Sequence, residues 1–317
     1  MVRWGVLGYA RIARTCLLPA IMEHKDSCAY ALATRNAQVA SEAKTEFGFE
    51  KVYLSYDELL DDSNVDVVYV PLPNSLHKEW AIKAMRKGKN VLCEKPMALN
   101  ADEAEQMFAV AKDCNVLLVE AFMYRFLEKV SMLEKLIDDG VIGDIRMLKS
   151  SWRFFLNRVN TIKEKPELGG GCLYDVGCYP VSLVNLIYKE LPSEVKVLKN
   201  IGENGVDMSI SAIMKYPDGK MAQIDAGFDS VSAKLTEISG TKGYIFMPET
   251  FVDEDMPITV MVSGESKPRV YKCNVQKRYL EEVKAVHDAI KAGKKELHDP
   301  KFSIMNAKLL ETILKAD

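Results

Sequence analysis

The chain has 317 residues, of which 48% are hydrophobic, and its formal net charge is -3. This length suits two domains, and this composition is typical of a globular protein with a sizeable core. Lysine and arginine are scattered rather than clustered, which argues against a nucleic-acid-binding surface. No run approaches the roughly 18 apolar residues of a membrane span.

The cysteine pattern points to the cytoplasm. The chain has seven cysteines, an odd number, with no C-x-x-C pair and no cysteine–histidine cluster. The first strand starts at once, without the pattern of a signal peptide. We therefore expect a reducing cytoplasmic location, no disulfide framework and no metal site.

Strands and helices alternate in the first third of the chain. The expected strands cover residues 2–7, 28–33, 65–70, 91–93 and 116–119, and the expected helices cover 11–23, 37–47, 75–87 and 101–114. Nearly continuous apolar strands that alternate with helices indicate a parallel sheet covered on both faces. We predict a doubly wound Rossmann domain over residues 1–121.

The pattern changes after this point. We expect a helix over residues 127–138, a long strand over 144–155, a helical stretch from the glycine run 169–171 to about 188, and helices at 277–292 and 303–315. Residues 194–275 are rich in strands with alternating character, which suits an antiparallel sheet. The fold class is thus α/β, with a second α+β domain over 122–317 that contains a large open sheet. Whether the last helix packs back on the first domain is left open.

A strand that ends in Glu94, Lys95 and Pro96 is the most informative segment. Open α/β sheets place ligands at the carboxyl ends of their strands, and Pro96 stops the strand there. Lys95 could face a ligand at this edge, with its pKa tuned by burial and by neighbours. The alternative is a surface turn with an ion pair.

A dinucleotide fingerprint follows the first strand. Residues 8–13 read GYARIA, a G-x-A-x-x-A variant of G-x-G-x-x-G/A. Gly8 suits the tight turn and Ala13 suits close helix–strand packing, whereas the methyl group of Ala10 weakens the match. The helix that begins here favours an anion at its N-terminus. Simple close packing is the alternative explanation.

The end of the second strand favours NADP(H) over NAD(H). Residues 34–36 are Thr34, Arg35 and Asn36, where NAD enzymes usually have an acid that binds the ribose 2′-hydroxyl. An arginine and a hydroxyl suit a 2′-phosphate. A solvated loop arginine is the alternative.

Four segments in this order resemble the glucose–fructose oxidoreductase/inositol dehydrogenase (Gfo/Idh/MocA) family of NAD(P)-dependent oxidoreductases. They are residues 71–77 (PLPNSLH), 94–96 (EKP), 120–126 (EAFMYRF) and 169–179 (GGGCLYDVGCY). The tyrosine at 179 is similar to the dihydrodiol dehydrogenase, xylose dehydrogenase and sugar ketoreductase branch. The resemblance covers essentially the whole chain.

The resemblance implies a set of cofactor-binding residues. They are Gly8, Ala10, Arg11, Ile12, Ala13, Thr34, Arg35, Asn36, Pro71, Leu72, Asn74, His77, Glu94, Lys95 and Arg125. The peptide before Pro96 is often cis in relatives. His77 has the alternative of a residue that caps or packs a helix, and Arg125 that of an anchor at the domain junction.

The expected catalytic residues are Lys95, Asp175 and Tyr179. Asp175 and Tyr179 are four residues apart, which puts them on one face of a helix. We expect the glycine run 169–171 to let backbone approach a ligand, and Pro180 to kink the helix. Tyr179, with its pKa lowered by the nearby Lys95, or Lys95 itself would transfer the proton. Asp175 would orient substrate hydroxyls or Lys95.

These residues predict an oxidoreductase that transfers a hydride between NADP(H) and a secondary alcohol or carbonyl of a sugar, polyol or trans-dihydrodiol. The alternatives are a non-catalytic NAD(P)-binding sugar sensor and an oxidoreductase that never releases its nucleotide. The resemblance also implies a homodimer or a dimer of dimers, formed through the open sheet.

Overall fold

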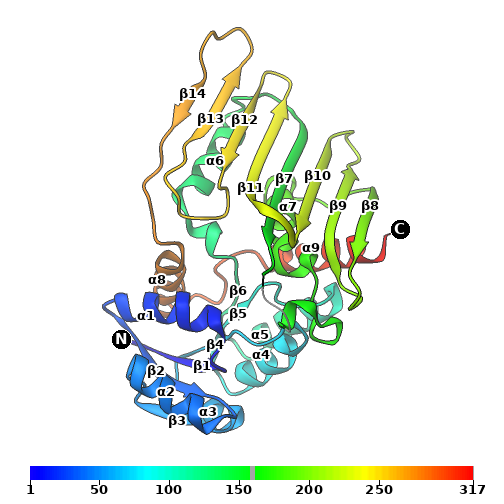
Figure 1. Ribbon diagram of the computed structural model, residues 1–317. Coiled ribbons are helices and arrows are strands. Elements are labelled where there is room, and N and C mark those ends of the chain that lie inside the picture. Colours follow the sequence, from blue (N-terminus) through cyan, green and yellow to red (C-terminus); the bar gives the residue numbers. More distant parts are fainter. Residues whose placement is uncertain (158–160, 317) are drawn as a thin grey trace. The chain divides into compact units, whose positions relative to one another are not determined.

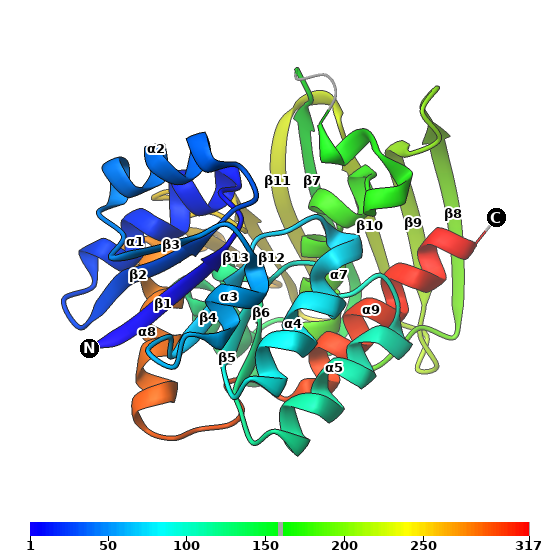
Figure 2. The same ribbon diagram turned by 90° about the horizontal axis from the view of Figure 1, so that it is seen from below.

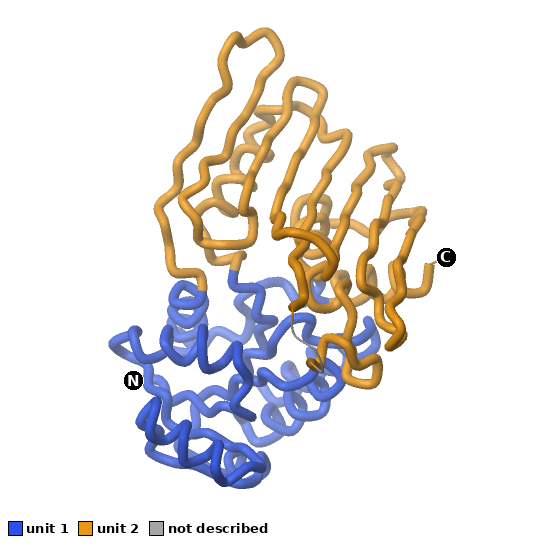
Figure 3. Tube along the Cα trace, viewed as in Figure 1, with its two compact units in different colours: residues 1–123, 279–303 blue, residues 124–278, 304–317 orange. Residues whose placement is uncertain are grey.

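The computed structural model describes residues 1–157 and 161–316. The chain forms two compact units (Figure 3). Unit 1 contains residues 1–123 and 279–303, and unit 2 contains residues 124–278 and 304–317. Of the described residues, no helix is both long and apolar enough to cross a lipid bilayer.

Unit 1 is built on a six-stranded parallel sheet in the order β3-β2-β1-β4-β5-β6 (Figure 1). Its strands are β1 (Val2–Leu7), β2 (Ser27–Ala33), β3 (Lys51–Tyr53), β4 (Val67–Val70), β5 (Asn90–Glu94) and β6 (Leu118–Ala121). Its helices are α1 (Leu18–Glu23), α2 (Ala37–Phe47), α3 (Tyr56–Asp61), α4 (His77–Arg86), α5 (Ala101–Asp113) and α8 (Arg278–Lys291). The predicted Rossmann fold is confirmed.

The strands are apolar because helices cover the sheet on both sides. Alternate residues of β1, such as Trp4 and Val6, share one buried core with Ile21 of α1 and Val286 of α8. Helices α4 and α5 lie on the opposite side of the sheet (Figure 2). A strand with both faces buried shows no alternation of polar and apolar residues, as the sequence of β4 illustrates.

Unit 2 contains an eight-stranded sheet in the order β14-β13-β12-β11-β7-β10-β9-β8. Its strands are β7 (Ile145–Phe155), β8 (Glu194–Ile201), β9 (Asp207–Lys215), β10 (Met221–Gly227), β11 (Asp229–Gly240), β12 (Gly243–Pro248), β13 (Ile258–Val262) and β14 (Arg269–Tyr271). Its helices are α6 (Glu128–Asp138), α7 (Cys178–Tyr188) and α9 (Pro300–Lys315). Among the described strand pairs of this sheet only β7–β10 is parallel, so the expected mainly antiparallel sheet is confirmed.

Two helices begin with a π-helical turn that precedes a proline. The turn Ala13–Leu17 precedes Pro19, and the turn Leu173–Gly177 precedes Pro180. Proline has no N–H to donate to the residue four positions before it, so the hydrogen-bond ladder is interrupted in its vicinity. The expected distortion near Pro180 therefore takes the form of a wider turn.

The sixth strand lies two residues later than expected, at Leu118–Ala121 instead of 116–119. An acid such as Glu120 is unusual in a buried strand, and the expected strand does not include it. In the structure Glu120 is buried, and its carboxylate accepts a hydrogen bond from the main-chain N–H of Met97 at 3.0 Å. Pairing with β5 and this bond together place the acid inside the strand.

Candidate active site

The turn after β5 carries the predicted lysine. Lys95 follows the last residue of β5, and its peptide bond to Pro96 is cis. The hydroxyl of Tyr69, from β4, donates a hydrogen bond to Oε1 of Glu94, and the N–H of Lys95 lies 3.3 Å from Oε2. Glu94 is thus tied to β4 and to its own turn, at the carboxyl edge of the sheet.

Two further buried side chains hold this turn. Nδ1 of His77 lies 2.9 Å from the carbonyl oxygen of Pro96, and Nε2 lies 2.8 Å from the carbonyl oxygen of Leu72. Glu120 binds the N–H of Met97, as described above. His77 therefore bridges the segments that follow β4 and β5. Sequence reasoning missed Glu120 as a support of this turn, although it begins one of the four quoted segments.

Burial lowers the pKa of His77 to about 4, and the positive charge of Lys95 acts in the same direction. The carbonyl groups favour the imidazolium form, and they oppose the shift. At neutral pH the ring is uncharged and donates to one carbonyl at a time. Both ring nitrogens of His77 contact carbonyl oxygens of unit 1, as expected for a histidine that packs within the fold.

Gly8 lies at the point where the strand order reverses, between β1 and β4. Its φ is +82°, which favours glycine. A Cβ at this position would lie 3.3 Å from Leu72 and 3.4 Å from the hydroxyl of Tyr56. The predicted cofactor residues Gly8 and Leu72 therefore lie together at the switch point, where doubly wound sheets bind ligands.

The helix after Gly8 starts as the fingerprint predicts. The N–H of Arg14 donates to the carbonyl of Ala10, and Ala13 is fully buried against the sheet. Arg11 is exposed and Ile12 is half-buried. Gly8 and the helix that follows thus have the strand–turn–helix arrangement of the fingerprint.

The segment after β2 presents one exposed cation. Thr34 is buried, and Arg35 is exposed. The side chain of Asn36 caps α2, because its Oδ1 accepts hydrogen bonds from the N–H groups of Gln38 and Val39. Arg35 is therefore the side chain of this segment that could bind a phosphate, and Asn36 shapes the loop.

The structure separates the predicted residues by unit. Pro71, Leu72, Asn74, His77, Glu94 and Lys95 belong to unit 1 with the fingerprint residues, whereas Arg125, Asp175 and Tyr179 belong to unit 2. Pro71 is buried after β4, and Asn74 begins a 3₁₀ turn, Asn74–Leu76, that leads into α4. Arg125 lies in the 3₁₀ turn Met123–Phe126 before α6.

Tyr179 lies in the first turn of α7 among aromatic side chains. Its ring centroid is 4.2 Å from that of Trp152, 5.6 Å from that of Phe251 and 6.0 Å from that of Tyr124. Trp152 also stacks on Phe251, with ring planes 9° apart. Tyr179 is only 4% exposed, so this cluster fixes the ring.

Asp175 lies in the π-helical turn before α7, and its partner was missed from the sequence. Nζ of Lys163 lies 2.5 Å from Oδ2 of Asp175. Lys163 comes from a loop of low apolar content, which carries no pattern that predicts a contact twelve residues away. Its position follows only from the tertiary structure.

The expectation that Gly170 and Gly171 let backbone approach a ligand is wrong. A Cβ on Gly170 would lie 2.6 Å from the carbonyl oxygen of Lys163, and a Cβ on Gly171 would collide with the carboxylate of Asp207. The chain itself occupies the space that the missing side chains leave.

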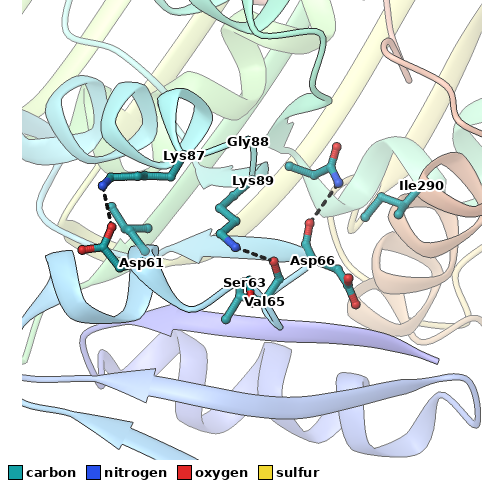
Figure 4. Close-up of a pocket in the computed structure, with 10 residues that line it drawn as sticks. Asp61, Ser63, Val65, Asp66, Lys87, Gly88, Lys89 and Ile290 are labelled. Carbon is teal, nitrogen blue, oxygen red and sulfur yellow. Dashed lines mark hydrogen bonds and ion pairs between the residues drawn. The ribbon is translucent and has the colours of Figure 1, made fainter.

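A pocket of about 490 Å³ lies at the opposite, amino end of the parallel sheet (Figure 4). Its charged side chains have partners within unit 1: Lys87 pairs with Asp61, and Nζ of Lys89 donates to the carbonyl groups of Asp62 and Val65. Lys89 thus donates hydrogen bonds to two main-chain carbonyl groups in the segment just before β4. The pocket contains none of the predicted site residues.

Two family models match the chain. Residues 2–122 match the oxidoreductase family with an NAD-binding Rossmann fold, and residues 130–246 match the GFO/IDH/MocA C-terminal domain. The chain belongs to the Gfo/Idh/MocA family. This membership confirms the resemblance inferred from the four segments, and it makes the protein an enzyme of the oxidoreductase class.

Curated relatives span most of this Gfo/Idh/MocA chain. A trans-1,2-dihydrobenzene-1,2-diol dehydrogenase from Xenopus tropicalis is 32% identical over 84% of this chain and 80% of its own length. A D-xylose 1-dehydrogenase (NADP(+)) from Haloferax volcanii is 30% identical over 99% of this chain and 96% of its own length.

Among solved structures, a 3-ketoreductase from Actinomadura kijaniata in complex with NADP and TDP-benzene is similar. It is 28% identical, covers 99% of this chain and 97% of its own, and has a TM-score of 0.90. Both units are thus arranged internally as in a family whose members bind a nicotinamide dinucleotide.

The depressed pKa of His77 predicts acid sensitivity. Above pH 6.5 the ring is neutral in both the folded and the unfolded chain. Between pH 6.5 and about 4 only the unfolded chain binds the proton, so stability is lost as the pH falls. From pH 7.5 to 5 this loss is about 2 kcal/mol.

We expect His77→Gln to reduce the pH dependence of the free energy of unfolding, measured with urea at pH 7.5 and 5, by about this amount. An unchanged pH dependence in His77→Gln would show that His77 is not held neutral.

Proposed function

We propose that this protein transfers a hydride between NADP(H) and a secondary alcohol or carbonyl of a sugar, polyol or trans-dihydrodiol. The observation that carries the proposal is the turn after β5. Three buried side chains (Tyr69, His77 and Glu120) hold Glu94 and Lys95 at the carboxyl edge of a Rossmann sheet. A turn whose main chain is held this firmly at the ligand-binding edge of the sheet is better explained by a catalytic lysine than by an exposed turn with an ion pair.

The residues of unit 1 fit a dinucleotide. Gly8 has the positive φ of the tight turn in the fingerprint, and we propose that N–H groups at the start of the helix that follows bind the pyrophosphate. We propose that the remaining predicted residues of unit 1, from Arg11 to Lys95, and Arg125 of unit 2 complete the binding site. His77 and Asn36 would contribute by holding the segments that carry the others. When bound, the nicotinamide donates or accepts the hydride.

The chain's own residues would manage the proton. Tyr179 is our first choice as the acid–base group, with Lys95 lowering its pKa through positive charge. Lys95 itself is the alternative, since a lysine can also be tuned to act as a base. Asp175 would orient hydroxyl groups of the substrate or Lys95.

The relatives support the class of substrate. A dihydrodiol dehydrogenase, a xylose dehydrogenase and a sugar 3-reductase all match this chain, and each acts on an oxygen-bearing carbon of a small ring or sugar. We propose a small-molecule substrate of this kind, in the cytoplasm. Of the predicted domains, 1–121 would bind the dinucleotide and 122–317 the substrate, except that residues 279–303 belong to unit 1. No nucleic-acid partner is proposed.

Two other functions use the same fold. A cofactor-binding sensor would bind NADPH and a sugar without turnover, and an oxidoreductase that keeps its nucleotide would retain it through purification. Absorbance of the reduced nicotinamide separates the three, with NADP and NAD in turn against D-xylose, levoglucosan, myo-inositol and trans-1,2-dihydrobenzene-1,2-diol.

We expect Lys95→Met and Tyr179→Phe each to lower kcat by about 10²–10⁴-fold, because each removes a group assigned to proton transfer. The dissociation constant of NADPH, measured by its fluorescence, should change little. The control is Lys112→Met, at an exposed lysine of α5. A variant that keeps most of its activity removes that residue from the mechanism.

Arg35→Asp should weaken NADPH binding by at least about tenfold more than NADH binding, because an acid would repel the 2′-phosphate. The measurement is the dissociation constant of each reduced cofactor. Arg86→Asp, at an exposed arginine that ends α4, is the control. Equal effects on both cofactors would contradict the NADP assignment.

We also propose that unit 2 forms a homodimer, or a dimer of dimers, through the open face of its sheet. Leu198, Ile213, Leu235 and Tyr244 are 81%, 49%, 40% and 44% exposed. The strand register puts them on the same face as Lys149 and Glu237. Isolated exposed apolar residues are common, but several on one sheet face suit an interface.

Light scattering should therefore give at least twice the mass of one chain. Leu198→Glu with Ile213→Glu should lower it, because charges would be buried at the interface. Leu54→Glu, at an exposed leucine of unit 1, should not. A monomer of the unsubstituted protein would refute the dimer.

A further inference from the structure

Residues 161–168 form a strap that precedes the glycine run in unit 2. The strap consists of two 3₁₀ turns, Ile162–Glu164 and Pro166–Leu168. In the first, the N–H of Thr161 donates to Oε2 of Glu164 at 3.1 Å, and the N–H of Glu164 donates to the carbonyl of Thr161 at 3.2 Å. Its conformation is thus fixed locally, before any contact with the rest of the unit.

Main-chain hydrogen bonds attach the strap to the glycine run. The N–H of Gly171 donates to the carbonyl of Lys163 at 2.8 Å, and that of Gly170 donates to the carbonyl of Lys165 at 3.0 Å. Gly170 permits this approach because a Cβ there would lie 2.6 Å from the carbonyl oxygen of Lys163. The attachment therefore places the Cα of residue 163 whatever side chain it carries.

The side chain of Lys163 is held on three sides. Its Nζ lies 2.5 Å from Oδ2 of Asp175, 4.8 Å from the ring centroid of Phe154 and 5.9 Å from that of Phe228. The two rings pack edge to face, with centroids 5.2 Å apart. An ammonium over an aromatic face is attracted by the ring quadrupole, so the rings favour the position that the carboxylate also favours.

The turn that carries Asp175 is fixed as well. Oδ2 of Asp207 accepts hydrogen bonds from the N–H of Leu173 at 2.7 Å and from the thiol of Cys172 at 3.0 Å. Burial raises the pKa of the Cys172 thiol, so it stays protonated and can donate. Asp207 thus anchors the start of the turn that carries Asp175.

We propose that Lys163 is a positioning residue for the reaction, which holds the carboxylate of Asp175 in the orientation that receives a substrate hydroxyl. The inference rests on the proposed function, because it concerns the role assigned there to Asp175. The carboxylate of Asp175 is restrained by Lys163 on one side and by the anchored turn on the other. It therefore loses little further conformational entropy when a substrate binds, and this is how positioning contributes to the rate.

The contacts argue against a role for Lys163 as an anchor for an anionic substrate. Asp175 already neutralises its charge, and the side chain of Lys163 is only 34% exposed. A phosphate or carboxylate of the substrate would have to compete with the aspartate. We therefore assign Lys163 to neutral polyols and sugars, whose hydroxyls can share the carboxylate.

The test compares Lys163→Met, Lys163→Arg, Asp175→Asn and the double variant Lys163→Met/Asp175→Asn. The matched control is Lys165→Met, on the same strap, where the side chain is exposed. The strap is attached through main chain, so we expect all variants to fold. The kinetic readouts are kcat and KM for whichever compound of the panel above is turned over.

We expect Lys163→Met to lower kcat/KM by about 10–100-fold while the NADPH dissociation constant stays unchanged, and Lys163→Arg to recover most of the loss. The double variant should be no worse than Asp175→Asn alone, because residues that act as one unit are not additive. Losses that multiply, or a Lys163→Met variant as active as Lys165→Met, would overturn the proposal.

A second readout does not depend on turnover. Aspartate labelled with ¹³C at the carboxyl carbon gives one resonance for Asp175, assigned as the signal that Asp175→Asn removes. It should shift in Lys163→Met and stay in place in Lys165→Met. An unmoved signal means that the pair is not formed, which overturns the inference; a shifted signal without turnover of any panel compound by the unsubstituted protein overturns the proposed function instead.

Discussion

The turn after β5 depends on side chains that bind main chain. A strand that ends in a proline leaves peptide groups without sheet partners, and buried peptide groups need hydrogen bonds. His77 takes up the carbonyl of Pro96 and Glu120 takes up the N–H of Met97. His77 belongs to α4 and Glu120 to β6. The turn after β5 therefore keeps its conformation only when both of these elements are in place.

The same principle applies in unit 2, with other atoms. The turn that carries Asp175 starts on the carboxylate of Asp207, and the strap is attached to two glycine N–H groups. In both units a buried acid binds a main-chain N–H close to a predicted catalytic residue. Glu120 binds the N–H of Met97, two residues after Lys95, and Asp207 binds that of Leu173, two residues before Asp175. These two acids therefore act as supports of the turns that they bind.

Much of the fold could be predicted from the sequence because its causes are local. Apolar strands such as β4 identify a covered parallel sheet, and a glycine such as Gly8 identifies a tight turn after a strand. The supports could not be predicted in this way. Nothing near Glu120 in the sequence indicates a partner at Met97, and nothing near Lys163 indicates Asp175, because these pairs form only when the chain is folded. The glycine run was misinterpreted for the same reason: glycine reports a close approach, but not what approaches.

The attachment of the strap through main chain has an evolutionary consequence. Hydrogen bonds from Gly170 and Gly171 to carbonyl groups do not depend on the side chains of the strap. Exposed positions such as 162 and 165 can therefore change without detaching it, whereas either glycine can be replaced only with a rearrangement of the chain around it. Homologous chains could differ at these exposed positions while the two glycines, and with them the main-chain position of Lys163, stay the same.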